Sequence, residues 1–157
     1  MNLDNLFKNF CKKNNLEINT YQLAIINKLK NYYRSNFNKS IFKKLFLKND
    51  LKPFFYLHGG VGVGKTMILN FFFDLVEEKK LRLHFNEFML SFHDFVHQRK
   101  EKNEENIIYQ FVKDLKSKTE LIYFDEFQVT NIVDAMILGK LFEQIFKENI
   151  KIILTSN

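Results

Sequence analysis

The amino-acid sequence predicts an α/β fold, a three-layer arrangement in which helices cover both faces of a parallel sheet. Short apolar runs that suit buried strands alternate along the chain with longer segments of helical periodicity. One run, Phe54–Leu57, leads into a glycine-rich loop, and another, Leu121–Phe124, leads into two adjacent acids. Strands joined by helical crossovers pair in parallel, so we expect the polar groups that follow these runs to meet at one edge of the sheet.

The length and composition indicate one folded domain. A chain of 157 residues can bury about two thirds of its unfolded surface. Its hydrophobic content of 46% and aromatic content of 16% exclude a disordered class. Cys11 is the sole cysteine, which excludes an internal disulfide and fits a reducing compartment. The first residues lack a secretion signal, and no apolar run approaches the roughly 20 residues that cross a bilayer. We therefore expect a soluble, cytoplasmic protein.

The positive charge does not by itself indicate a nucleic-acid partner. The net charge is +6 and the isoelectric point is about 9.3, but the cations are mostly lysines scattered along the chain. The arginines are Arg34, Arg82 and Arg99, and no basic block is interleaved with aromatics. A solvated, lysine-rich surface explains this pattern.

Periodicity divides the chain into an N-terminal helical extension, residues 1–52, and an α/β core, residues 53–157. Residues 1–18 show no clear period and suit either a short helix or a loose end. Further helices are expected at 41–47, 66–80, 87–100 and 104–115, and strands at 54–57, 81–85, 121–124 and 151–155.

Two further helices are marked by capping residues. Asn19 or Thr20 can cap the first, with Gln22 in its opening turn and an apolar stripe that follows. Thr130 or Asn131 can cap the second. Its apolar stripe consists of Val133, Ile137, Leu141 and Ile145.

The glycine-rich loop fits the phosphate-binding pattern G-x-x-x-x-G-K-[ST]. It consists of Gly59, Gly60, Val61, Gly62, Val63, Gly64, Lys65 and Thr66. Glycines allow the backbone N–H groups to surround a polyphosphate, Lys65 places a cation on its outer oxygens, and the Thr66 hydroxyl can coordinate Mg²⁺. A strand before the loop and a helix after it form the context that this motif requires, so the sequence predicts a nucleoside triphosphate site.

The acids after the third predicted strand have the roles that phosphoryl transfer requires. Asp125 can hold the Mg²⁺ shell, and Glu126 can polarise the attacking water. The fourth predicted strand ends at Asn157, whose amide can orient that water or sense the γ-phosphate. A zinc site at His93 and His97 is not indicated, because the sequence has no Cys pair or His-Glu-x-x-His pattern to complete it.

These motifs resemble those of a known family. Gly59–Thr66, Asp125-Glu126 and Thr155–Asn157 resemble the Walker A, Walker B and sensor 1 elements of AAA+ ATPases in order and spacing. The segments His84–His93 and Phe124–Met136 are similar to signatures of the ZapE/Afg-type ATPases within that class. The resemblance covers about residues 52–157, with a weaker helical match before them.

The sequence departs from the family pattern at a few positions. His58 and Val63 vary places at which the family tolerates change, and Asn86 stands where His is expected.

The resemblance implies ATP and Mg²⁺ as cofactors and an activity coupled to protein partners, in cell division or protein quality control. Full-length relatives are expected to form ring oligomers, in the cytoplasm or peripheral to the inner membrane. Lys65, Glu126 and Asn157 would be the catalytic residues, Gly59–Thr66 would bind the nucleotide, and Thr66 and Asp125 would hold the metal.

The chain stops at sensor 1, whereas members of the family continue into a fifth strand, an arginine finger and a helical lid. None of the three arginines lies downstream of sensor 1. Strand order in the family resembles 5-1-4-3-2, so the absence of strand 5 would leave Phe54–Leu57 on an open, apolar edge. We therefore expect a C-terminally truncated AAA+ core with impaired hydrolysis.

Two alternatives to the ATPase interpretation stay open from the sequence. One is a noncatalytic nucleotide-binding fragment, which binding without turnover would support. The other is a helicase-loader-like, DNA-associated ATPase that uses the positive charge, which salt-dependent DNA binding would support.

Overall fold

The computed structural model describes residues 2–37, 52–60, 62–99 and 103–157. The helices are α1 (Leu3–Lys13), α2 (Thr20–Phe37), α4 (Lys65–Leu75), α5 (Phe85–His97), α6 (Glu104–Lys118) and α7 (Ile132–Lys147), and the strands are β1 (Phe54–His58), β2 (Lys80–His84), β3 (Leu121–Asp125) and β4 (Lys151–Ser156). The helix predicted at 41–47 lies outside the described residues.

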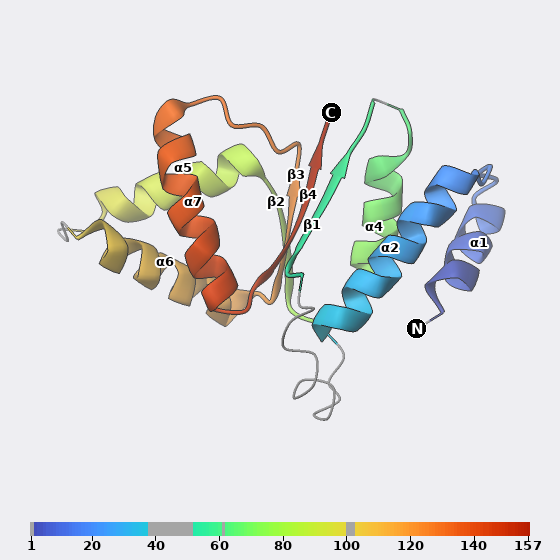
Figure 1. Ribbon diagram of the computed structural model, residues 1–157, viewed down its shortest axis with the longest axis horizontal. Coiled ribbons are helices and arrows are strands. Elements are labelled where there is room, and N and C mark those ends of the chain that lie inside the picture. The colour runs from blue at the N-terminus through green and yellow to red at the C-terminus, as the bar shows by residue number, and fades with distance from the viewer. Residues whose placement is uncertain (1, 38–51, 61, 100–102) are drawn as a thin grey trace.

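The four strands form one parallel sheet in the order β1-β4-β3-β2. Figure 1 shows this sheet between two groups of helices, with α1, α2 and α4 on one side and α5, α6 and α7 on the other. The predicted α/β/α arrangement and parallel sheet are confirmed. The order also places β1 and β2 at the two edges.

Side chains of the central strand β3 alternate between the two helical layers, as the pleat of a strand requires. Tyr123 packs in the apolar cluster with α1, α2 and α4, and Phe124 packs in the cluster with α5, α6 and α7. All five β3 residues are buried. This explains why β3 reads as a continuous apolar run rather than an alternating one.

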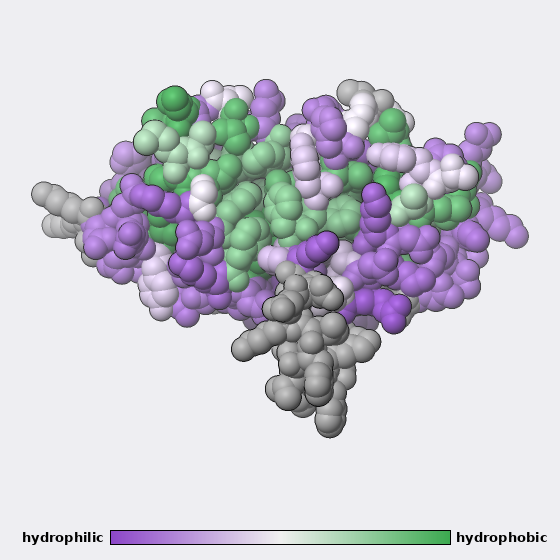
Figure 2. All heavy atoms as spheres, viewed as in Figure 1, coloured by the Kyte–Doolittle hydropathy of each residue, from purple (hydrophilic) through white to green (hydrophobic). Residues whose placement is uncertain are grey.

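Strand β1 is less buried than its apolar run suggests, and it lies at the open edge that the family's strand order leads us to expect. Phe54 is 39% exposed and Tyr56 is 49% exposed. The reason is position, because β1 pairs only with β4 among the described strands and lies at the sheet edge. Figure 2 shows the same view as Figure 1 in space-filling form, with apolar side chains gathered over the sheet between more polar helices.

The N-terminal segment forms a helix, α1, rather than a loose end. Leu3, Phe7 and Cys11 recur every fourth residue, and all three are fully buried against the neighbouring helices. Burial raises the pKa of the Cys11 thiol. Helix α2 begins with a reciprocal cap, since the Gln22 backbone N–H donates to Asn19 Oδ1 (2.8 Å) and the Asn19 N–H donates to Gln22 Oε1 (3.2 Å).

Several helix boundaries differ from the predicted ones. The helix after the loop ends at Leu75 rather than at residue 80, because Val76 takes an extended conformation (φ −71°, ψ 126°) and Lys80 opens β2. Phe85, predicted at the end of a strand, begins α5. Helix α5 ends at His97 and α6 continues to Lys118.

The apolar stripe of α7 is only partly buried. Leu141 and Ile145 are fully buried, whereas Val133 is 54% exposed. The apolar cluster on this side of the sheet meets α7 from Ile137 onward, so the first turn lies beyond it. Asn131 caps the helix, with its Oδ1 accepting from the Val133 N–H at 2.8 Å. Within the described residues, no helix combines the length and apolar character needed to span a membrane.

Candidate functional site

The predicted site residues meet at the carboxyl edge of the sheet. The glycine loop joins β1 to α4, Asp125 ends β3 with Glu126 directly after it, and Asn157 directly follows β4. Ligands of open parallel sheets bind at this edge, because loops from several strands converge there. The topology therefore gathers residues that lie up to about 100 positions apart in sequence.

Two glycines in the loop have backbone conformations that disfavour side chains. Gly62 has φ of 83° and Gly64 has φ of 85°, in the left-handed region that glycine enters without steric cost. At Gly64 an added Cβ would also lie 3.2 Å from Gln22 Nε2. The chain can therefore turn sharply into α4 and direct the N-terminus of that helix toward the loop. Val61 lies outside the described residues.

Lys65 connects the loop to the end of β4. Its side chain is buried, and Nζ donates hydrogen bonds to the Gly59 carbonyl, the Gly60 carbonyl (2.7 Å) and Asn157 Oδ1 (2.9 Å). An ammonium group has three N–H donors, and these contacts engage all of them. The structure thus brings together Lys65 and Asn157, which the sequence predicts as site residues. Thr66 is exposed on the first turn of α4.

The start of α2 also lies beside the loop. An added Cβ at Gly59 would meet the Tyr21 hydroxyl at 3.4 Å, and Gln22 faces Gly64. Tyr21 is 45% exposed. The sequence predicts a helix here but no contact with the loop, because only the fold brings the two segments together.

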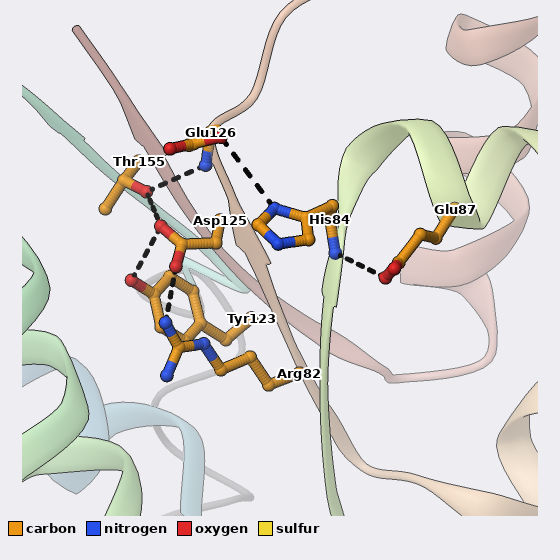
Figure 3. Close-up of polar contacts among 7 residues, drawn as sticks. All are labelled: Arg82, His84, Glu87, Tyr123, Asp125, Glu126 and Thr155. Atoms are coloured by element: carbon orange, nitrogen blue, oxygen red, sulfur yellow. Dashed lines mark hydrogen bonds and ion pairs between the residues drawn. The ribbon is translucent and has the colours of Figure 1, made fainter.

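Asp125 lies in a hydrogen-bonded cluster drawn from three strands (Figure 3). Arg82 Nη2 on β2 donates to Asp125 Oδ2. The Tyr123 hydroxyl (3.2 Å) and the Thr155 hydroxyl (3.0 Å) donate to Asp125 Oδ1. Burial raises the pKa of Asp125, but the hydrogen bonds from Arg82, Thr155 and Tyr123 and the charge of Arg82 outweigh burial and hold that pKa below its usual value.

Burial and the neighbouring Asp125 charge raise the pKa of Tyr123 to about 12. Its phenol is therefore a stable donor to the carboxylate at neutral pH. The cluster as a whole keeps Asp125 ionised and fixes the direction of its two oxygens.

Glu126 projects away from the cluster. Its side chain is 74% exposed, and its backbone has φ of 53°. The Glu126 N–H donates to Thr155 Oγ1 at 3.3 Å, and the following Phe127 N–H donates to the Thr155 carbonyl at 2.6 Å. His84 Nδ1 lies 3.9 Å from a Glu126 carboxylate oxygen. The chain after β3 is therefore held to β4 while the carboxylate remains accessible.

Sequence reasoning assigned no site role to four residues that surround the acids. These are Arg82, His84, Tyr123 and Thr155. The contacts of Arg82 and His84 depend on the register of β2 with β3, in which His84 is opposite Asp125 and Arg82 is opposite Tyr123. The contact of Thr155 depends on the pairing of β3 with β4. The available signal is the alternation of Lys80, Arg82 and His84 with leucines along β2, which indicates one polar face.

The donor set at this edge suits Mg²⁺, which prefers oxygen ligands and keeps several waters. A carboxylate has about four acceptor positions. Arg82, Tyr123 and Thr155 use three of those on Asp125 within the described residues, which leaves room for a metal-bound water. The described residues contain no group of three or more His, Cys, Asp or Glu side chains that could hold a metal.

The strand order, the glycine loop before α4 and the acids after β3 together define a phosphate-loop α/β core. A family model described as AFG1-like ATPase matches residues 5–157. The chain belongs to this family, which confirms the resemblance found in its motifs.

Two curated relatives match about two thirds of the chain. Lactation elevated protein 1 homolog B from Danio rerio is 41% identical over an alignment of 113 residues, which covers 66% of this chain and 22% of the relative. Cell division protein ZapE from Escherichia coli K12 is 40% identical over 105 residues, which are 65% of this chain and 27% of the relative. The match thus spans about a quarter of the length of these relatives.

Among solved structures, C. elegans PCH-2 is similar with a TM-score of 0.48 and 18% sequence identity, covering 87% of this chain and 37% of that chain.

Proposed function

We propose that this chain binds ATP together with Mg²⁺ and supplies the phosphate-binding half of an ATPase that acts on protein partners. The contact between Lys65 Nζ and Asn157 Oδ1 carries the proposal. It joins the phosphate loop to the end of β4, the arrangement that a site assembled across strand ends requires. Family membership supports the same activity.

Lys65 and the loop amides would bind the phosphates. The N-terminus of α4 adds the partial positive charge of the helix dipole, which favours an anion at this position. Lys65 already lies among carbonyl oxygens of Gly59 and Gly60, so it would exchange these acceptors for phosphate oxygens without leaving the loop.

The metal would be held by the Thr66 hydroxyl and, through water, by Asp125. When bound, Mg²⁺ would neutralise charge on the phosphate oxygens. The protein's own contribution is to keep Asp125 ionised and oriented, through Tyr123 and Thr155.

Glu126 is the proposed general base and Asn157 the residue that orients the attacking water. The accessible Glu126 carboxylate, beside a backbone anchored to Thr155, supports this role. Asn157 is exposed and already pairs with the lysine of the loop.

We further propose that the activity serves protein partners, in division or protein quality control, and that the whole protein works in the cytoplasm as a ring. The Escherichia coli relative is a cell division protein, which supports a role of this kind.

Binding of a fluorescent ATP analogue tests the proposal. Lys65→Ala should weaken binding about 10- to 100-fold, because charge-assisted hydrogen bonds to phosphate are lost. Lys79→Ala, which changes an exposed lysine just before β2, is the matched control and should bind as the wild type does. Equal affinity of the Lys65→Ala and wild-type proteins would contradict the proposed site.

Turnover separates a working ATPase from a noncatalytic binding module. We expect the 157 residues alone to hydrolyse ATP slowly, because Arg82 pairs with Asp125 and Arg99 contacts Phe95 and Gln110. An arginine finger contributes about 10³- to 10⁵-fold in rate. Glu126→Gln should abolish the residual turnover and preserve binding. A turnover rate equal to that of a longer relative would contradict this expectation.

A further inference from the structure

A cation from the adjacent strand already contacts the acid proposed to hold the metal. Arg82 donates through Nη2 to Asp125 Oδ2. Its guanidinium carbon also lies 5.0 Å from the centroid of the Tyr123 ring, at the position opposite it in the β2–β3 register. The ring and the carboxylate together determine where the arginine points (Figure 3).

This pairing changes the charge that an approaching metal ion meets. The Asp125 side chain is 11% exposed, so water screens its interactions weakly. An isolated carboxylate there would present one negative charge to a divalent ion. With Arg82 in contact, the pair presents almost no net charge, and most of the attraction is offset.

Few other carboxylates are in place to restore the attraction. Within the described ranges of the chain, no three His, Cys, Asp or Glu side chains gather into a metal-binding group. Glu126, the nearest acid in sequence, is 74% exposed and directed toward His84. The negative charge needed to hold Mg²⁺ at this edge must therefore come largely from the nucleotide.

We propose that Arg82 is a positioning residue that makes metal binding depend on nucleotide. It holds Asp125 in the orientation that the ion needs and at the same time offsets the charge of that carboxylate. Mg²⁺ therefore binds strongly only when nucleotide phosphates are present. This inference rests on the proposed ATP and Mg²⁺ site. It adds a residue from β2 whose effect is on the divalent cation rather than on the phosphates.

The first experiment measures Mn²⁺ binding by electron paramagnetic resonance, with no nucleotide present. The wild type should bind Mn²⁺ weakly, and Arg82→Gln should bind it at least about tenfold more tightly, because the offsetting charge is gone. Arg82→Lys keeps the charge and should remain close to the wild type. A folded Arg82→Gln protein with unchanged Mn²⁺ affinity would overturn the inference.

Two further variants locate the effect. Arg99→Gln removes another arginine that stacks on a ring, Phe95, and donates to Gln110, and it should leave Mn²⁺ affinity unchanged. Adding Asp125→Asn to Arg82→Gln should abolish the gain. A gain that survives this second change would arise elsewhere on the surface and would overturn the inference.

A second measurement follows the wild-type chain and needs no substitution at Arg82; variants at the other two arginines serve only to assign the signals. Labelling with ¹⁵N-arginine gives Nε–H signals from Arg34, Arg82 and Arg99, which Arg34→Lys and Arg99→Gln assign by elimination. Adding Mg²⁺ to the protein with a nonhydrolysable ATP analogue should shift the Arg82 signal and leave the other two in place. An unmoved Arg82 signal, with the analogue bound, would overturn the inference.

The two experiments also separate this inference from the proposed function. If the ATP analogue does not bind, the proposed function fails, whereas the nucleotide-free Mn²⁺ measurement still decides the effect of Arg82. If the analogue binds and Mn²⁺ affinity does not respond to Arg82→Gln, the role of Arg82 alone is wrong.

Discussion

The two edge strands of the sheet, β1 and β2, carry different kinds of side chain. Strand β2 alternates Lys80, Arg82 and His84 with leucines, whereas β1 reads Phe-Phe-Tyr-Leu-His and has no charged residue before His58. Both strands pair on one side only among the described strands. Natural sheets commonly protect such edges with charged side chains that hinder pairing with another chain.

On β2 each polar side chain also has a defined contact. Lys80 donates to carbonyls at the end of α4, Arg82 contacts Asp125, and His84 lies near Glu126. On β1 the exposed side chains are aromatic: the Phe54 ring contacts Tyr56 and Phe146, and the Tyr56 hydroxyl is hydrogen-bonded to Ser156 Oγ at 2.6 Å. The β2 edge thus carries cations that hinder pairing with another strand, whereas the β1 edge presents uncharged aromatic side chains.

The largest expected effect comes from adding a charge to β1. We expect the chain to self-associate through the β1 edge. Tyr56→Lys should lower the association constant at least about tenfold, because a lysine buried in that contact would lose its hydration. Sedimentation equilibrium over a range of protein concentrations measures this constant.

The matched control is Leu81→Lys on β2, since Leu81 is also a partly exposed apolar residue of an edge strand, at 36%. It should leave the association constant unchanged, because Lys80 and Arg82 already protect that edge. Equal effects of the two substitutions would show that the edges do not differ as described.

A smaller effect is expected when a cation is removed from β2. Lys80 Nζ donates to the carbonyls of Phe73, Val76 (2.7 Å) and Asp74 (3.3 Å), which end helix α4. Lys80→Ala should lower the free energy of unfolding by about 1 kcal/mol, since cations stabilise helix C-termini. Urea denaturation measures it, with Lys28→Ala at an exposed lysine of α2 as the control, and an unchanged midpoint for Lys80→Ala would contradict the contact.

The smallest effect concerns the segment that enters β2. The Tyr33 hydroxyl donates to the Glu78 carboxylate at 3.1 Å, and burial, followed by the charge and hydrogen bond of Glu78, raises the pKa of Tyr33 to about 12. An unfolded tyrosine titrates near pH 10, so the unfolded chain loses this proton first as the pH rises. Stability from Tyr33 is therefore present below about pH 10 and is lost between about pH 10 and 12.

Tyr33→Phe removes this titration. The free energy of unfolding of the wild type, relative to Tyr33→Phe, should decline by less than about 1 kcal/mol between about pH 8 and pH 11, because solvent screens a partly exposed group. A difference that stays constant over this range would contradict the assignment. Urea denaturation at the two pH values provides the measurement.

Periodicity predicted the order of the elements well because most helices and strands here bury a clear apolar pattern. The capping residues Asn19 and Asn131 marked two helix starts correctly. Boundaries shifted where the pattern does not change at the junction, as at Phe85, whose apolar side chain suits the end of a strand and the start of a helix equally.

The site was predictable only where a motif is continuous in sequence. Gly59–Thr66 and the pair Asp125-Glu126 are local patterns, and Asn157 follows from the end of a strand. Arg82 and Thr155 reach Asp125 through strand pairing. Sequence spacing carries no information on that register, so their contacts required the fold.

Cys11, fully buried where α1 packs on the core, gives the molecule a natural reporter of local opening. A thiol reagent can reach this single sulfur only when α1 leaves its neighbours, so the labelling rate reads the free energy of that opening directly. Helix α1 packs against α2, and α2 begins beside the glycine loop. The labelling rate of Cys11 can therefore report how tightly α1 and α2 are packed when a ligand occupies the glycine loop.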